Sequence, residues 1–178
     1  MIRLAIIVIF VSLIASSVLA GTWRDDFEKG FVGWEGLDDC WKVENGECSG
    51  EYWNAPESMF ELIWPGKIWA KDYILNFKMK FVGNLGGCAG TNFRHTQQDR
   101  YGFGIMTDTN IVKGWKFFQG VVTELSKEPL LFIPFKDIWY ELKVIAKGDH
   151  YEFYIDEELA SEFKDKSIPS GWVVFIYY

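Results

Sequence analysis

Apolar and polar side chains alternate along most of this chain. The clearest run covers residues 72–82, where alternate positions carry Tyr, Leu, Phe, Met and Phe. Most of the positions between them carry Asp, Asn or Lys. A period of two is the spacing of a β-strand with one buried face, so this run predicts a strand that turns its aromatic residues toward a core.

The same alternation recurs near the end of the sequence and predicts a hairpin. Residues 140–147 and 151–156 both alternate, and Lys147-Gly148-Asp149 separates them with residues typical of a turn. Gly, Asn and Pro turns divide the chain into roughly eleven expected strands, and no segment has convincing helical periodicity, which favours a β-sandwich or barrel. The other expected strands include residues 58–63, 88–94, 101–106, 115–125, 130–133, 159–163 and 172–178, the last apolar on both faces.

An Asn-Gly pair at residues 45–46 predicts a type I′ hairpin turn, because both residues tolerate positive φ. That register places Val43 opposite Cys48 and puts Cys40 on the other face of the hairpin from Cys48. A Cys40–Cys48 disulfide would need the register to break. A Cys48–Cys88 bridge remains open, and three cysteines leave one odd.

Short motifs of this sequence occur at corresponding places in a known family. They are Asp25-Asp26-Phe27-Glu28, Trp34, the hairpin of residues 41–47, Trp139-Tyr140, Gly148-Asp149, Tyr154-Ile155-Asp156 and Pro169-Ser170-Gly171. In these motifs the chain resembles the laminin G-like jelly-roll domains of the concanavalin A-like lectin/glucanase superfamily. Its Phe93-Arg94 pair resembles the Phe-Arg found at this point in laminin G-like and 3-keto-disaccharide hydrolase domains. The resemblance implies an all-β, concanavalin A-like jelly-roll sandwich of two antiparallel sheets.

The resemblance also raises a question about the last strand. Domains of that family end with a further strand that pairs with the opening strand, whereas this sequence stops at Tyr178. Two expectations follow. Either the domain lacks its last strand, or a sheet edge beside Tyr177 and Tyr178 stays open to a strand of a partner protein.

The first twenty residues have the composition of a secretory signal peptide. Arg3 gives a positive start, residues 4–13 are apolar apart from Ser12, and residues 16–20 end on small side chains. We expect cleavage after Ala20, secretion, and one domain over residues 21–178. The alternative is an uncleaved membrane anchor, because the apolar run is close to spanning length. No second run of that length exists, so no membrane contact is expected after cleavage.

The net charge and the metal-binding residue types argue against several classes of partner. The net charge is −7 for the whole sequence and −8 once Arg3 is removed, which argues against nucleic acid and anionic membranes as partners. Without a Cys-x-x-Cys motif or a Cys/His cluster, zinc is not expected, and His95 and His150 are too few for a histidine-rich site. As in some related jelly rolls, Asp25 or Asp26 could bind a structural calcium ion, the alternative being a solvated edge.

Nine tryptophans are the compositional feature that most needs an explanation. The family resemblance implies core positions for Trp34, Trp41, Trp139 and Trp172. The other candidates lie beside turns or strand ends, where the rim of a sandwich meets a ligand: Trp53, Trp64, Trp69 and Trp115. Exposed aromatic rings in such places stack on the apolar faces of sugars.

The predicted ligand site lies on the sheet formed by residues 88–106 and 115–125. If Phe93 points into the core, its neighbours Asn92 and Arg94 point outward, above Gly102 and Gly104 of the adjoining strand. Trp115 would supply a stacking platform, and Gln119, four residues further on, would share its facing. The predicted polysaccharide-binding residues are therefore Asn92, Arg94, Trp115 and Gln119.

Several alternatives to this site stay open. Arg94 would instead form a surface ion pair, and Trp115 would be buried if the face that it shares with Phe117 is the core. Two residues on the loop between the strands, His95 and Asp99, are expected to be solvated.

Three functions compete at this stage. The first is a secreted, lectin-like carbohydrate-binding domain without catalysis of its own. The second is a glycoside hydrolase of the 3-keto-disaccharide hydrolase or glucanase type, with Glu124 as its best single acid. Its weakness is that no Glu-x-Asp-x-x-Glu run supplies the paired carboxylates that such enzymes need. The third is a structural or adhesive module that binds protein through an open sheet edge.

Overall fold

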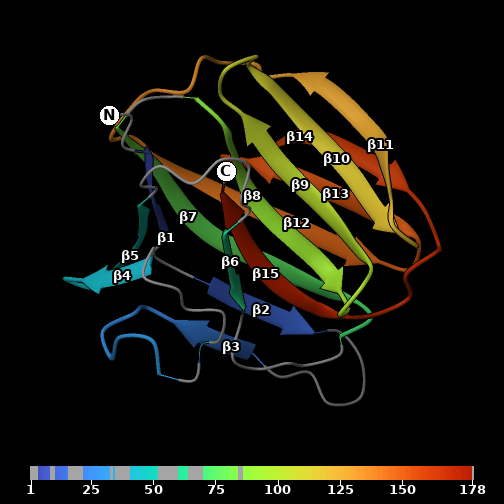
Figure 1. Cartoon of the computed structure of the whole chain (residues 1–178), viewed down its shortest axis with the longest axis horizontal. Helices are drawn as coiled ribbons and strands as arrows, with labels where there is room; N and C mark the ends of the chain where they lie inside the picture. Colours follow the sequence, from blue (N-terminus) through green and yellow to red (C-terminus); the bar gives the residue numbers. More distant parts are fainter. Residues whose placement is uncertain are drawn as a thin grey trace.

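Two antiparallel sheets face each other in the computed structural model of this chain (Figure 1). The structure describes residues 4–8, 11–15, 22–32, 34, 41–51, 60–63, 70–83 and 86–177. Every regular element within these residues is a strand. The described part of the chain holds no helix of the length and apolarity that a membrane span requires. The predicted all-β sandwich is confirmed.

The nine-stranded sheet forms the rear layer in Figure 1, in the order β14-β13-β12-β7-β1-β5-β4, with β2 paired to β7 and β3 paired to β2. Its strands are β1 (Leu4–Val8), β2 (Val11–Ala15), β3 (Thr22–Asp25), β4 (Trp41–Glu44), β5 (Glu47–Glu51), β7 (Tyr73–Gly83), β12 (Trp139–Lys147), β13 (His150–Ile155) and β14 (Glu158–Lys164).

The six-stranded sheet forms the front layer, in the order β11-β10-β9-β8-β15-β6 (Figure 1). Its strands are β6 (Phe60–Ile63), β8 (Cys88–His95), β9 (Arg100–Met106), β10 (Ile111–Phe118), β11 (Val121–Pro129) and β15 (Trp172–Tyr177). β15 joins strands that are far apart in sequence, because it pairs with β8 on one side and with β6 on the other.

The core lies between the sheets and is built from the alternate positions that the sequence predicted. On β7, the residues from Tyr73 to Phe81 that share one face are each at most 2% exposed, while Lys78 on the other face is exposed. Rings from the two sheets stack directly, as Phe103 and Phe153 do with centroids 5.2 Å apart. The alternation of β7 was therefore interpreted correctly, and its inward face carries aromatic side chains, Leu and Met.

The Asn-Gly hairpin is also confirmed. Asn45 and Gly46 have φ angles of 54° and 72°, as a type I′ turn requires, and Val43 pairs with Cys48. Cys48 and Cys88 are both buried, and they lie on different sheets without a disulfide between them. Burial raises the pKa of the Cys48 thiol above its ordinary value. Cys40 lies outside the described residues, so its pairing stays a prediction.

The segment predicted to be a signal peptide contributes β1 and β2 in this structure. β12 pairs along one edge of β7, and β1 and β2 pair one after the other along the other edge. Cleavage after Ala20 would remove both of these short strands. If residues 1–20 are retained, β1 and β2 cover this edge of β7, and if they are cleaved, β7 loses both neighbours.

Two of the predicted strands differ from the observed ones. Residues 115–125 were expected to form one strand, but Gln119 and Gly120 both have positive φ and turn the chain between β10 and β11. Residues 130–133 form an irregular segment, in which Phe132 stacks on Tyr140 at 5.1 Å instead of joining a sheet.

The expected open edge at the end of the chain is not found along β15. This strand has a hydrogen-bonded neighbour on each side, and residues 173–176 are each at most 2% exposed. The prediction that the last strand is covered on both faces is confirmed. Tyr178 lies outside the described residues.

Candidate functional site

A row of residues crosses the outer face of the six-stranded sheet, the side turned away from the core. Strand pairing places Val174, Asn92, Gly102, Trp115 and Glu124 next to one another, each on a different strand from β15 to β11. The intervening residues of β9 point into the core, which fixes this row on the outer side. Residues from distant parts of the sequence therefore meet on one side of the sheet, where Val174 and Asn92 are buried and Trp115 and Glu124 are partly or well exposed.

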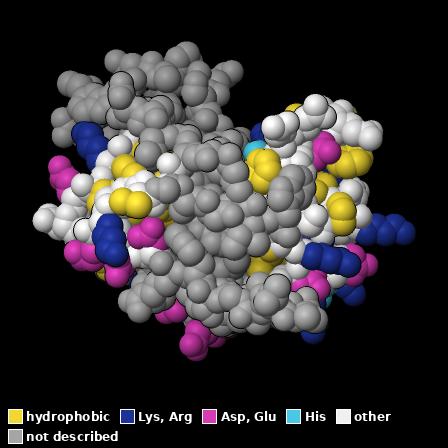
Figure 2. Space-filling view, turned by 90° about the horizontal axis from the view of Figure 1, so that it is seen from below, with side chains coloured by type: hydrophobic (Ala, Val, Ile, Leu, Met, Phe, Trp, Pro, Cys, Tyr) yellow, Lys and Arg dark blue, Asp and Glu magenta, His cyan; other side chains and the backbone are white. Residues whose placement is uncertain are grey.

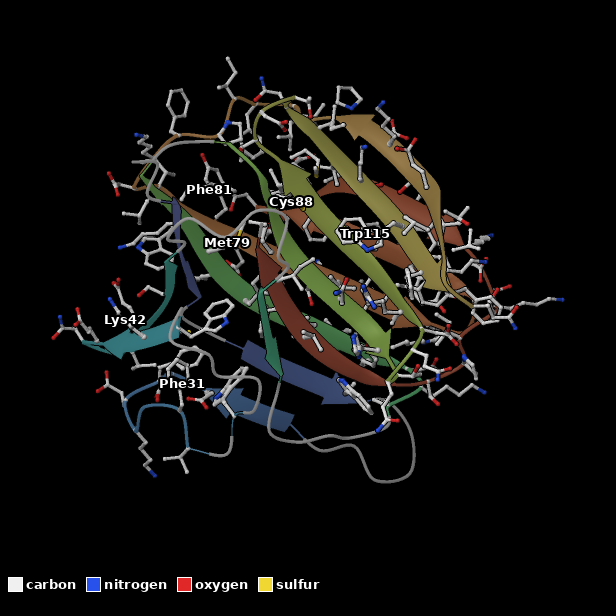
Figure 3. The ribbon with its side chains drawn as sticks, viewed as in Figure 1. Phe31, Lys42, Met79, Phe81, Cys88 and Trp115 are labelled. Carbon is white, nitrogen blue, oxygen red and sulfur yellow. The ribbon has the colours of Figure 1, made fainter. Side chains whose placement is uncertain are left out.

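The indole of Trp115 lies across β9 at the centre of this surface (Figure 3). A Cβ atom added to Gly102 would lie 2.3 Å from the ring, and one added to Gly104 would lie 2.9 Å from it. Real Cβ atoms do not approach so closely, so only glycine at both positions lets the ring rest on the backbone. The half-buried indole forms a platform over a glycine floor.

Charged side chains border this platform on two sides. The guanidinium carbon of Arg100 lies 4.5 Å from the centroid of the Phe117 ring, a cation–π contact. On the other side, Lys113 forms an ion pair with Glu124 at 3.3 Å. Together with Met106 and Val122, these residues line a hollow of about 230 Å³. We call this surface the Trp115 platform.

The platform combines one apolar ring with donors and an acceptor at its rim. Such a combination suits a ligand that has an apolar face and hydroxyl groups around its edge, because the ring packs against the face while the rim fixes the orientation. Sugars have this form. At the end of the molecule that is seen from below in Figure 2, acidic and basic side chains are interspersed around the edge of the described surface.

A second polar cluster fills one end of the space between the sheets. The guanidinium of Arg94 donates to the hydroxyl of Tyr151, to the carbonyl of Ile168 at 3.1 Å and to the carbonyl of Lys71 at 2.6 Å. Desolvation by burial raises the pKa of Tyr151 to about 12, although the positive charge of Arg94 acts to lower it. This phenol is therefore a neutral partner of the arginine.

Asp165 anchors the same end of the sandwich. Its carboxylate accepts hydrogen bonds from Tyr101 at 2.5 Å and from the Lys116 ammonium at 2.6 Å. Burial alone would raise the pKa of Asp165, but these bonds, with others from Ser167, outweigh it and hold the pKa below its usual range. The Tyr101 hydroxyl also accepts the backbone N–H of Ile168 at 3.0 Å. The hydrogen bonds of Arg94 and those of Tyr101 therefore both hold the segment around Ile168 against the sheets.

Comparison with solved structures identifies the fold. The carbohydrate binding module CBM66 from Bacillus subtilis is similar, with a TM-score of 0.68 and 18% identity over 81% of this chain and 86% of that module. The β-glucanase of Bacillus licheniformis follows the same path, with a TM-score of 0.60 and 14% identity over 90% of this chain and 85% of that enzyme. This chain has the concanavalin A-like jelly-roll fold.

A third solved structure broadens the range of functions found on this jelly roll. Sheep galectin-11 in complex with glycerol matches with a TM-score of 0.50 and 15% identity, over 69% of this chain and 91% of the galectin. No protein-family model matches the sequence, and no curated protein matches it. The jelly-roll fold that the sequence motifs predicted is thus confirmed, and identities of 14–18% show the fold alone.

Two of the four predicted site residues lie in the row on the outer face of this jelly roll. Trp115 forms the platform, and Phe117, which shares its facing, also points outward, so that side of β10 is not the core. Asn92 pairs with Gly102 as predicted, but it is fully buried. Asn92 therefore lies beneath the surface, between Val174 and Gly102, instead of at the rim.

Arg94 was predicted to point outward beside Asn92, and this prediction is wrong. Its φ angle is +44°, which breaks the strand alternation at this residue, and its side chain is only 1% exposed. The side chain turns toward the end of the core, where Tyr73 and Tyr151 bind its backbone N–H and its guanidinium. Arg94 is a structural residue, and Arg100 is the arginine at the platform.

Gln119 was predicted to share the facing of Trp115, but it lies in the turn between β10 and β11. Its φ angle is +51°, and its backbone N–H donates to the carboxylate of Asp99 at 2.8 Å. His95 was expected to be solvated, yet it is only 6% exposed and packs against Trp172 at 5.6 Å between ring centroids. Asp99 is half-buried.

Three residues of the site were not predicted from the sequence: Arg100, Lys113 and Phe117. Arg100 could have been found, because it shares its facing with Gly102 and Gly104 on one strand. Lys113 lies before residue 115, where its strand was predicted to begin, so it was not considered as a residue of the sheet. Glu124 was singled out as an acid, and the strand register places it beside Trp115.

The other tryptophans divide between core and surface. Trp34 and Trp41 are each 5% exposed, which confirms their core assignment. Trp139 and Trp172 are half-buried instead, and the ammonium of Lys80 lies 4.6 Å from the centroid of the Trp139 ring. Trp53, Trp64 and Trp69 lie outside the described residues.

The predicted calcium ligands have other partners in this structure. Asp25 accepts the indole N–H of Trp34 at 2.8 Å and the backbone N–H of Phe27 at 2.7 Å. Asp26 is exposed, and its carboxylate accepts the backbone N–H of Glu28 at 3.3 Å. Asp25 thus closes the turn that follows β3, and the calcium site stays a prediction.

Proposed function

We propose that this protein is a secreted carbohydrate-binding module that binds a polysaccharide through the Trp115 platform and does no catalysis of its own. The observation that carries the proposal is the indole of Trp115 lying over Gly102 and Gly104. Sheet residues with side chains would lift the ring off the backbone. The glycine pair instead leaves a broad, shallow surface of the kind that an extended sugar chain fits.

The rim of the platform supplies what a sugar's hydroxyl groups need. Arg100 and Lys113 are donors, and Glu124 is an acceptor. Arg100 and Lys113 border the indole from opposite ends, since one lies beside Phe117 and the other beside Gly104 along the strand pairing. A ring stacked on Trp115 would have polar groups at both edges. The likeness to the carbohydrate binding module CBM66 supports the same class of ligand.

A glycoside hydrolase is the second candidate, favoured by the position of Glu124 beside the platform. Hydrolysis of a glycosidic bond requires two carboxyl groups, about 5 Å apart in enzymes that retain configuration and further apart in those that invert it. Across β8 to β11 and β15, the outward-facing residues that the structure describes include one carboxylate, Glu124. Binding without hydrolysis is therefore the better supported function.

A glycan array, followed by titration calorimetry with the best ligand, tests the proposal. Trp115→Ala should abolish binding while leaving the thermal melting curve nearly unchanged, because the indole packs on the outside of the sheet. Trp139→Ala is the matched control, since it removes a half-buried tryptophan from the nine-stranded sheet. Glycan binding should survive in that variant.

Other results would overturn the proposal. Equal binding by wild type and Trp115→Ala would place the glycan elsewhere. A sugar product that accumulates with wild type and not with Glu124→Gln would make the protein an enzyme. Absence of any glycan ligand, together with capture of a protein partner, would favour the adhesive module instead.

Secretion is a separate part of the proposal and rests on the composition of residues 1–20. Intact mass measurement of material collected outside the producing cells should give a chain that begins at Gly21. A secreted chain that retains Met1 would contradict it, and would leave β1 and β2 in place beside β7.

A further inference from the structure

We propose that the outer face of the nine-stranded sheet holds a site for a divalent transition-metal ion, formed by His150, Glu152 and Glu162. One ligand atom from each of these three residues can be chosen so that all three atoms lie within 4.8 Å of one another. The cluster lies on β13 and β14. The Trp115 platform is on the other sheet, so the metal site does not depend on the glycan-binding proposal.

Strand geometry brings the three side chains together. His150 and Glu152 are two residues apart on β13, and so they share one face of the sheet. Glu162 on β14 is directly opposite Glu152 in the antiparallel pair. The imidazole Nε2 of His150 lies 2.7 Å from an oxygen of Glu162, and its Nδ1 lies 3.8 Å from an oxygen of Glu152.

The charges of this cluster favour a cation. Two carboxylates directly opposite each other on neighbouring strands repel, and such pairs destabilise a sheet unless a positive group lies between them. Two lysines, Lys164 and Lys147, are opposite His150 on its two neighbouring strands, one step away from the two glutamates. A bound divalent ion between the carboxylates would remove the repulsion directly.

A tyrosine holds one of the ligands in place. The hydroxyl of Tyr154 donates to Glu152 Oε2 at 2.8 Å, while Glu152 Oε1 faces His150. Lys143 in turn lies over the Tyr154 ring, with its ammonium 4.1 Å from the centroid. Hydrogen bonds of this kind to a ligating carboxylate are typical of metal sites, where they fix the orientation of the ligand.

The ligand types indicate which ion fits. One imidazole nitrogen and two carboxylate oxygens suit Zn²⁺, which binds these atoms at about 2.0–2.2 Å and accepts water as a fourth ligand. All three side chains are partly exposed, so water can reach that position. Ca²⁺ and Mg²⁺ prefer oxygen ligands throughout and should bind here weakly. This site was not predicted from the sequence, because its ligands come from two strands and include a single histidine.

Titration calorimetry of the chelator-treated full chain with ZnCl₂ tests the proposal, with CaCl₂ as the comparison. Wild type should bind one zinc ion, show a raised melting temperature in zinc, and give little heat with calcium. His150→Gln and Glu162→Gln should each weaken zinc binding at least about tenfold, and Tyr154→Phe should weaken it less.

Glu158→Gln is the matched control, because it removes the same charge from the same strand outside the cluster. It should bind zinc as wild type does. Zinc binding that is unchanged in both His150→Gln and Glu162→Gln would place the ion elsewhere, for instance on cysteine, and would overturn the proposal. Absence of zinc binding by folded wild type, checked by circular dichroism, would overturn it equally.

Discussion

Arg94 and Arg100 lie on neighbouring strands, and each packs against an aromatic ring, yet they belong to different environments. The guanidinium carbon of Arg94 is 4.8 Å from the centroid of the Tyr151 ring inside the sandwich. That of Arg100 is 4.5 Å from the centroid of the Phe117 ring on the outer face. Residue type and ring contact are the same, so they cannot by themselves tell a structural arginine from a ligand-binding one.

Backbone conformation and hydrogen bonding make the difference. The positive φ of Arg94 turns it to the inside, where its guanidinium donates to Tyr151 and to two backbone carbonyls, and its backbone N–H donates to Tyr73. Arg100 keeps the regular alternation of β9, and therefore shares a face with the glycine floor. An arginine whose terminal nitrogens donate to a buried phenol and two backbone carbonyls stabilises the fold, whereas one at the rim of a hollow can donate to a ligand.

The largest expected effect is on stability and comes from Arg94. Arg94→Ala leaves the buried Tyr151 hydroxyl and Ile168 carbonyl, and the partly buried Lys71 carbonyl, without their donor, so it should lower the free energy of unfolding by about 3–5 kcal/mol. Arg100→Ala should cost about 0.5–1 kcal/mol, the value of an exposed cation–π contact. Urea denaturation measures both. Equal costs would show that the two arginines do not differ as described.

Gly102→Ala should have the next largest effect and acts on the platform. The new methyl group meets the Trp115 ring, which must move, at a cost of about 1–3 kcal/mol in stability. Glycan binding should be lost and the fluorescence of the indole should change. Gly86→Ala is the control, because nothing lies within 4 Å of the added Cβ. That variant should stay within about 0.5 kcal/mol of wild type.

The smallest expected effect is on the pH dependence of the free energy of unfolding, and it comes from Asp165. The pKa of Asp165 is lower in the folded state than in the unfolded state. Its carboxylate therefore stabilises the fold fully above the unfolded pKa, and this stabilisation is lost as the pH falls through the folded pKa. The free energy of unfolding should therefore drop by about 1–2 kcal/mol as the pH falls from about 5 to 2. Asp165→Asn should remove most of that change. An unaltered pH profile in this variant would contradict the role given to the Lys116 and Tyr101 bonds.

The fold was more predictable than the site because the fold depends on local signals. The alternation from Tyr73 to Phe81 and the Asn45-Gly46 turn are each visible within a few residues, and both are confirmed. The register that aligns Trp115 with Gly102 and Glu124 joins three strands, and nothing local specifies it. Trp115 could be selected from the sequence, but its neighbours could not.

Single backbone angles explain the errors. Alternation assumes an extended chain, and the positive φ at Arg94 and Gln119 breaks that assumption at two of the four predicted residues. Arginine and glutamine carry no sequence signal for this conformation, unlike Asn45. Gly120, beside Gln119, was the available hint of a turn in what was predicted as one long strand.

The position of β15 between β8 and β6 has a consequence for how the chain folds. Val174 pairs with Asn92 on one side and with Ile63 on the other, so the six-stranded sheet cannot close until residues near the end of the sequence arrive. Pairings this distant in sequence make folding slow, on the order of milliseconds to seconds for all-β domains. Until then, β6 and β8 present unpaired edges, and this interval is when newly made chains are most exposed to aggregation.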